Sequence, residues 1–165
     1  MAIENPLEYA IQLEKDGLAF YSTAADSTQS ILGKKMFESL AADEVRHIAI
    51  LENIAKLINV EISDETPKER LATLFTELGP QIQEELGANP SDTEVVEKAL
   101  GLEKTAVEFY EGQADGSEDA DHKLIFKRLA DEERQHVEIL QNTLQYLNDT
   151  GHWFLWNEQG MLDGG

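Results

Sequence analysis

Apolar residues recur every three or four positions along four stretches of the chain, the spacing that gives an α-helix one buried face. Helix start signals support two of these stretches, because Asn5 is followed by Pro6, and Ser91 is followed three residues later by Glu94. The pattern predicts helices near residues 6–27, 30–59, 92–114 and 118–148. The chain is therefore expected to be all-α.

A long connection, about residues 60–91, separates the second predicted helix from the third. It has too many residues for a tight turn. Thr66, followed by Pro67 and Glu69, signals a short helix near 67–78, which Gly79 and Pro80 end. The two helices before this connection and the two after it are thus expected to form two helical hairpins.

The two hairpins repeat each other at a constant offset of 89 residues. Residues 10–26 match residues 99–115 at eight of seventeen positions, and residues 37–53 match residues 126–142 at another eight of seventeen. Unrelated segments would share about one residue in seventeen. The chain therefore consists of two copies of one helix pair.

A long crossover between two helical hairpins is one known way to close a four-helix bundle. The repeat then requires a pseudo-two-fold axis across the bundle, so that matching positions of the two copies face each other. We expect one bundle domain at residues 1–150 and a C-terminal tail at residues 151–165.

Polar residues interrupt the buried stripe at matching positions of both copies. Each copy carries a glutamate on its first helix and a Glu-x-x-His motif on its second, with both motif side chains on one helix face. The six residues are Glu14, Glu44, His47, Glu103, Glu133 and His136. The expected axis brings all six together in the middle of the core.

Four carboxylates a few ångströms apart in a dry core repel each other by several kcal/mol, even at an effective dielectric constant of about 20, and they also lose hydration. Two divalent cations would neutralise the four charges, and neutral imidazoles would complete the coordination without adding charge. A single Glu-x-x-His motif is common, whereas a duplicated motif with one extra glutamate per copy is specific. The residues therefore predict a site for two metal ions.

The stretches "LEKDGLAFY", "ADEVRH", "LEKTAVEFY" and "DEERQH" resemble the rubrerythrin family of ferritin-like di-metal carboxylate proteins, over roughly residues 5–148. The resemblance implies a ferritin-like four-helix bundle and a di-iron centre held by the six residues above, with manganese or zinc as possible substitutes. It implies that Glu44 and Glu133 bridge the two ions. It also implies that Tyr21 and Tyr110 lie in the second shell of the site; as residues alone, they could equally be core aromatics.

The resemblance implies an oxidoreductase that reduces hydrogen peroxide to water in protection against oxidative stress. Rubrerythrins commonly take electrons from a rubredoxin-like domain with four cysteines, and this chain has no cysteine, so an external donor such as a rubredoxin is expected. The family also typically supplies a seventh carboxylate one turn after the glutamate of the third helix. Here that position is Ala106, matched by Gly17 in the first copy.

Three alternatives remain open at the level of the sequence. The protein could be a ferroxidase or other iron-handling protein that uses O₂, since the symmetric six-ligand set also resembles the ferroxidase centre of bacterioferritins. It could be a di-iron oxygenase acting on an organic substrate. It could also hold metal for structure alone.

The net charge of −20 and the isoelectric point of about 4.3 disfavour nucleic acid and anionic membranes as partners. The absence of cysteine excludes disulfides, thiolate nucleophiles and iron–sulfur clusters within these residues. No run approaches the ~18 apolar residues of a membrane span, and the first residues lack the pattern of a signal peptide. A cytoplasmic location is expected.

The C-terminal tail contains four consecutive apolar residues, 153–156. We expect these residues to cap the bundle or to be buried against a second subunit, which favours a homodimer or larger homo-oligomer.

Overall fold

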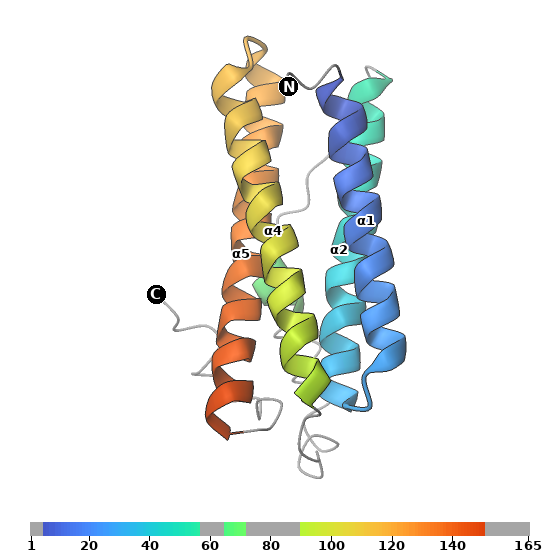
Figure 1. The fold of residues 1–165 in the computed structure, drawn as a ribbon. Coiled ribbons are helices and arrows are strands. Elements are labelled where there is room, and N and C mark those ends of the chain that lie inside the picture. The colour runs from blue at the N-terminus through green and yellow to red at the C-terminus, as the bar shows by residue number, and fades with distance from the viewer. Residues whose placement is uncertain (1–4, 57–64, 72–89, 151–165) are drawn as a thin grey trace.

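Four long helices form an elongated bundle in the computed structural model, which describes residues 5–56, 65–71 and 90–150 (Figure 1). They are α1 (Pro6–Ser27), α2 (Ile31–Ala55), α4 (Pro90–Gly116) and α5 (Ala120–Thr150). Helix α1 packs mainly on α2 and α4 mainly on α5, so the chain forms two hairpins that meet through α1 with α4 and α2 with α5. The predicted all-α, ferritin-like four-helix bundle is confirmed.

The second hairpin begins at the opposite end of the bundle from the end of the first (Figure 1). The connection must therefore travel back along the bundle, as a long crossover does. Within it the structure describes residues 65–71, of which 67–71 are helical. Thr66 and Glu69 form a capping box, in which the backbone N–H of each residue donates to the side chain of the other. The rest of the predicted short helix, residues 72–78, lies outside the described residues.

Capping side chains set several helix ends. The Asn5 side chain accepts a hydrogen bond from the Glu8 N–H, as its position before Pro6 predicts. Asp119 caps α5 by accepting from the N–H groups of Asp121 and His122, so that helix begins at Ala120 and not at 118. Helix α2 ends at Ala55, short of the predicted 59, because Lys56 leaves helical geometry at φ −91° and ψ 3°.

Helix α4 begins earlier than the sequence predicts. Pro90 begins the helix, two residues before the predicted start, so Ser91 lies inside the first turn and does not cap it. Proline suits this position because the first N–H groups of a helix have no partner within it. The other ends of α4 and α5 lie two residues beyond the predicted 114 and 148.

The apolar core divides into two clusters of buried residues, and matching residues of the repeat lie in both. Tyr21 stacks on Phe37 with ring centroids 6.2 Å apart and planes at 26°. Their counterparts, Tyr110 and Phe126, also lie 6.2 Å apart, at 23°. The first pair belongs to one cluster and the second pair to the other. The bundle therefore has the pseudo-two-fold symmetry that the repeat predicts.

None of the described helices is long and apolar enough to cross a membrane. The tail at residues 151–165, on which the expected contact with a second subunit depends, lies outside the described residues, so the homo-oligomer stays a prediction.

Candidate metal centre

A layer of six polar side chains lies in the middle of the bundle. Each of the four long helices contributes, because α1 and α4 carry one glutamate each, while α2 and α5 carry one Glu-x-x-His motif each. All six side chains are buried: Glu14, Glu44, His47, Glu103, Glu133 and His136. The structure thus brings together all six residues that the sequence predicts to converge.

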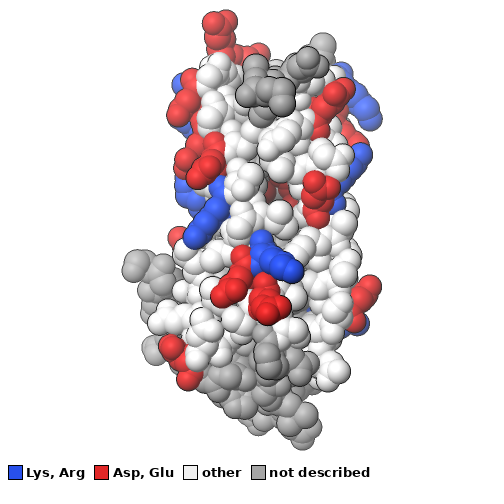
Figure 2. Space-filling model, viewed as in Figure 1, with Lys and Arg blue, Asp and Glu red and all other residues white. Residues whose placement is uncertain are grey.

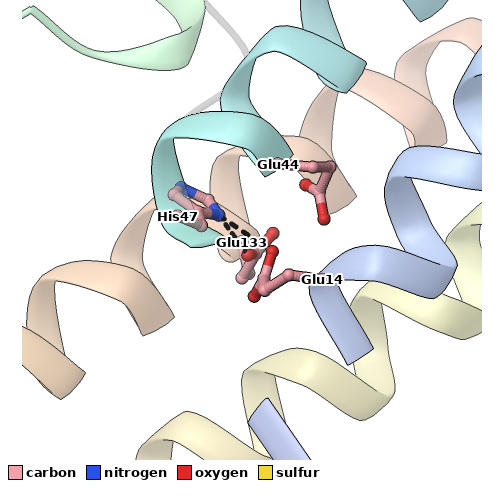
Figure 3. Close-up of side chains that lie close together, drawn as sticks. All are labelled: Glu14, Glu44, His47 and Glu133. Carbon is pink, nitrogen blue, oxygen red and sulfur yellow. Dashed lines mark hydrogen bonds and ion pairs between the residues drawn. The ribbon is translucent and has the colours of Figure 1, made fainter. Parts of the chain in front are cut away.

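These side chains form two overlapping groups that could each hold a metal ion. One group is Glu14, Glu44, His47 and Glu133, drawn in Figure 3, and the other is Glu44, Glu103, Glu133 and His136. Within each group, one potential ligand atom from every residue lies within 4.8 Å of the others. Glu44 and Glu133 belong to both groups, which is the arrangement needed for two carboxylates shared between neighbouring ions.

Glu133 lies between the two histidines. Its Oε1 is 2.9 Å from His47 Nδ1, and its Oε2 is 2.9 Å from His136 Nδ1. The two imidazole rings are stacked with their planes at 26° and their centroids 6.0 Å apart. Each histidine also contacts the glutamate of its own group, since His47 Nδ1 is 3.2 Å from Glu14 Oε2 and His136 Nδ1 is 3.2 Å from Glu103 Oε1. Both rings therefore direct Nδ1 toward the centre.

The opposite nitrogen of each histidine contacts a carboxylate outside the six. His47 Nε2 lies 2.8 Å from Glu132 Oε2, and His136 Nε2 lies 2.9 Å from Asp43 Oδ2. A carboxylate accepts a hydrogen bond from a protonated nitrogen, so these contacts favour a proton on Nε2. With that proton in place, loss of the Nδ1 proton would leave the Nδ1 lone pair for a cation. Asp43 and Glu132 thereby fix the orientation of both rings.

Arginines in turn hold these two outer carboxylates. Arg46 pairs with Glu132 and lies 3.4 Å from Asp43 Oδ1. Arg128 Nε is 3.1 Å from Glu132 Oε1, and Arg70, from the crossover, lies 2.5 Å from Asp43 Oδ1. Burial alone would raise the pKa of both acids, but the histidine and arginine contacts hold each pKa below its ordinary value. Both outer groups are therefore carboxylates at neutral pH.

The two predicted tyrosines contact the first-helix glutamates of the opposite hairpins. Tyr21 donates a hydrogen bond from its hydroxyl to Glu103 Oε1, and Tyr110 donates one to Glu14 Oε1. Burial, together with the nearby glutamates, raises the pKa of both hydroxyls well above the ordinary value. The tyrosines thus stay protonated and orient the two glutamates.

Burial and the contacts among the six side chains together set the protonation of the metal-free centre. Burial and repulsion from neighbouring carboxylates raise the pKa of Glu44 well above its ordinary value and that of Glu103 to about 8. Burial would also raise the pKa of Glu133, but His47 and His136 hold it well below its usual range. Although burial opposes imidazolium, contact with the glutamates raises the pKa of both histidines well above the ordinary value. Protons on Glu44, Glu103 and the histidines therefore reduce the repulsion between carboxylates in the metal-free centre.

Several atoms that face the centre form no well-directed hydrogen bond among the described residues, although Glu133 lies within ion-pair distance of both histidines. These atoms are Glu44 Oε1, both carboxylate oxygens of Glu133, and His136 Nδ1. Buried polar atoms without hydrogen bonds are costly, and once deprotonated each of these atoms can donate an electron pair to a cation in the same small volume. Oxygen and imidazole ligands of this kind suit iron, manganese and zinc. The donor set therefore fits two transition-metal ions.

Most of the chain matches a known protein family. The family model for rubrerythrin matches residues 5–144, which include all four long helices up to the last turns of α5. The chain belongs to the rubrerythrin family. No curated protein and no solved structure matches it in the same comparisons.

Rubrerythrins bind a di-iron centre, and the two overlapping groups lie within the matched residues. The position of the family's seventh carboxylate is buried Ala106 in this rubrerythrin. The six-residue set is thus symmetric between the two copies of the repeat.

Sequence reasoning missed the two outer carboxylates of this rubrerythrin, Asp43 and Glu132. A signal existed, because each directly precedes the glutamate of a Glu-x-x-His motif and the two acids match at the offset of 89. They were missed because an acidic residue beside a motif also suits an exposed helix face. Both side chains are buried.

Neutralising the outer carboxylates is expected to weaken metal binding. Asp43→Asn and Glu132→Gln keep the size of each side chain but remove the charge that favours the Nε2–H form of the facing histidine. We expect each variant to lose roughly tenfold or more in affinity for divalent metal, measured by titration calorimetry. Glu138→Gln is the matched control, since Glu138 lies on α5, is partly exposed and pairs with Lys68. Unchanged affinity in both variants would contradict the orienting role.

Proposed function

We propose that the six converging residues bind two iron ions, with Glu14 and His47 on one ion, Glu103 and His136 on the other, and Glu44 and Glu133 shared. The observation that carries this proposal is the pair of four-residue groups that have Glu44 and Glu133 in common. Manganese or zinc could occupy the same ligands, because oxygen and imidazole donors accept several divalent ions.

We further propose that this rubrerythrin is a peroxidase that protects against oxidative stress. Membership of the family suggests this role. In the ferrous state the two ions would supply the two electrons that, with two protons, reduce one hydrogen peroxide to two water molecules.

The protein side chains would contribute orientation, exclusion of water and placement of protons. Tyr110 holds Oε1 of Glu14 and leaves Oε2 facing His47, whereas Tyr21 holds Oε1 of Glu103, the oxygen that also faces His136. Asp43 and Glu132 keep the imidazole protons on the outer nitrogens. The apolar clusters on either side exclude bulk water from the layer.

Continuous turnover would require a separate electron donor. The chain contains no cysteine and so cannot hold a rubredoxin-type iron within these 165 residues. We propose a small external redox protein, such as a rubredoxin, as the source of electrons.

The oxidant preference of the reduced protein tests the peroxidase proposal. Anaerobic protein loaded with two ferrous ions is mixed in a stopped-flow instrument with either hydrogen peroxide or O₂. We expect oxidation by peroxide to be much the faster, and rubredoxin with its reductase to sustain consumption of peroxide. Faster oxidation by O₂ would overturn the proposal.

An alternative is that iron itself is the substrate and O₂ the oxidant. The specific observation that favours it is Ala106, whose buried methyl group stands where the family typically has a further carboxylate. A ferroxidase would oxidise iron well beyond two ions per chain in the same experiment. Oxidation that stops at two ions per chain would exclude this alternative.

A further inference from the structure

Gly17 lies in the interior of α1, one turn after Glu14, and is buried against the metal centre. Glycine weakens a helix interior relative to alanine, because it loses more conformational freedom on folding. The position therefore calls for a local reason that outweighs helix propensity.

The reason is the carboxylate of Glu44. A Cβ atom built on Gly17 would lie 2.6 Å from Glu44 Oε2 and 3.3 Å from Glu44 Cδ. A carbon atom and an oxygen atom that are not bonded do not lie 2.6 Å apart, so one of the two groups would have to move. Because the colliding atom is at the end of a flexible side chain, the shift would fall on the Glu44 carboxylate and not on the helix backbone.

The two copies of the repeat differ at this position. Ala106, which matches Gly17 at the offset of 89, is buried with its methyl group in an apolar cluster. The carboxylates that the two copies share also differ, since Glu133 contacts both histidines at 2.9 Å, whereas Glu44 is 3.6 Å from His136 Nδ1. The other Glu44 oxygen, Oε2, lies against α1 at Gly17, where no side chain intervenes.

We infer that Gly17 is a positioning residue: the space left by its missing side chain holds the Glu44 carboxylate where it can be shared between the two ions. From that position the other Glu44 oxygen, Oε1, forms no hydrogen bond among the described residues and lies 3.6 Å from His136 Nδ1, on the side of the centre. A methyl group at residue 17 would displace the carboxylate and deprive both ions of a ligand. This inference rests on the proposed metal centre and adds a residue that touches no metal itself.

The test uses Co²⁺ alone as the probe, because its visible absorption reports the coordination of the ion, and compares Gly17→Ala with the wild type and with Gly101→Ala. Gly101 is the matched control: it lies inside α4, and nothing among the described residues comes within 4 Å of a Cβ placed there. Both substitutions are expected to maintain or raise the melting temperature of the metal-free protein, since alanine favours the helix.

We expect Gly17→Ala to weaken Co²⁺ binding by roughly tenfold or more, to alter the visible spectrum and to reduce the rise in melting temperature on adding the ion. Gly101→Ala is expected to match the wild type in all three. In a Glu44→Ala background, Gly17→Ala should cause no further loss, because the colliding carboxylate is gone. If the collision with Glu44 prevents the single variant from folding, the double variant is expected to fold.

Wild-type affinity and spectrum in Gly17→Ala would overturn the inference while leaving the proposed metal centre intact. A loss that persists undiminished in the Glu44→Ala background would overturn it too, since the effect would not then pass through Glu44. Failure of the wild-type protein to bind Co²⁺, Fe²⁺ or Mn²⁺ would instead overturn the proposed metal centre. The two failures are therefore distinguishable.

Discussion

Replacing Glu44 and Glu133 together with alanine is expected to abolish the binding of two metal ions per chain. Each of these carboxylates belongs to both four-residue groups, so the double substitution removes two of four ligands from each ion. Loss of the shared ligands should weaken binding by more than ~10³-fold, since each displaced charge contact to a divalent ion is worth several kcal/mol. Metal analysis after anaerobic iron loading and desalting measures the result.

The matched control for this experiment is a double variant of exposed acids on the same two helices. Glu38 lies on α2 and pairs with Lys35, and Asp131 lies on α5 and pairs with Arg134. Glu38→Ala with Asp131→Ala changes the net charge equally but should retain two ions per chain. Two ions in the Glu44, Glu133 variant would remove these residues from the proposed ligand set.

Metal binding is expected to raise the melting temperature strongly at pH 8 and only weakly at pH 5. Metal at about a thousand times its dissociation constant stabilises the folded state by about 4 kcal/mol, which for a chain of this size is on the order of 10 °C. The metal must displace protons from the glutamates and histidines, so its apparent affinity falls as the pH falls.

The stability of the metal-free protein should decrease as the pH rises from 5 to 8, whereas the stabilisation by metal increases over the same range. The pKa of Glu103 rises on folding from its ordinary value of 4.5 to about 8, and the pKa values of Glu44, His47 and His136 also rise. The folded state then binds more protons than the unfolded state between about pH 4.5 and 8, so the free energy of unfolding decreases as the pH increases through that range. At still lower pH, stability falls again as Asp43 and Glu132 become protonated, because folding lowers their pKa values.

Thermal melts with chelator and with metal between pH 5 and 8 measure both effects. The two curves should converge toward pH 5 and diverge toward pH 8. Equal melting temperatures with and without metal at pH 8 would contradict a buried metal centre. A metal-free protein that becomes more stable from pH 5 to pH 8 would contradict the protonation state inferred for its carboxylates.

The sequence predicted the bundle and the six converging residues because both follow from periodicity. A buried stripe identifies the helix faces, and the offset of 89 residues pairs Glu14 with Glu103 and each motif with its counterpart, independently of exact helix ends. Helix ends were less predictable because they depend on single side chains, as with Asp119 at the start of α5. The ligand roles of the six residues remain a proposal.

Contacts between side chains of different helices were beyond the reach of the sequence pattern. The pairing of Asp43 with His136 and of Glu132 with His47 depends on how α2 and α5 approach each other. The role of Gly17 depends on the distance from α1 to Glu44. Neither distance is encoded in a period of 3.6 residues, which describes only one helix at a time.

Several contacts that support the centre pass between the two hairpins. Tyr21 and Tyr110 each reach the glutamate of the opposite hairpin, and each histidine reaches an outer carboxylate of the opposite hairpin. A single ancestral hairpin that associated with a copy of itself would therefore already have presented the same set of donors and supports. Duplication and fusion of its gene would have made the two copies free to diverge, which accounts for Gly17 opposite Ala106 and for Asp43 opposite Glu132.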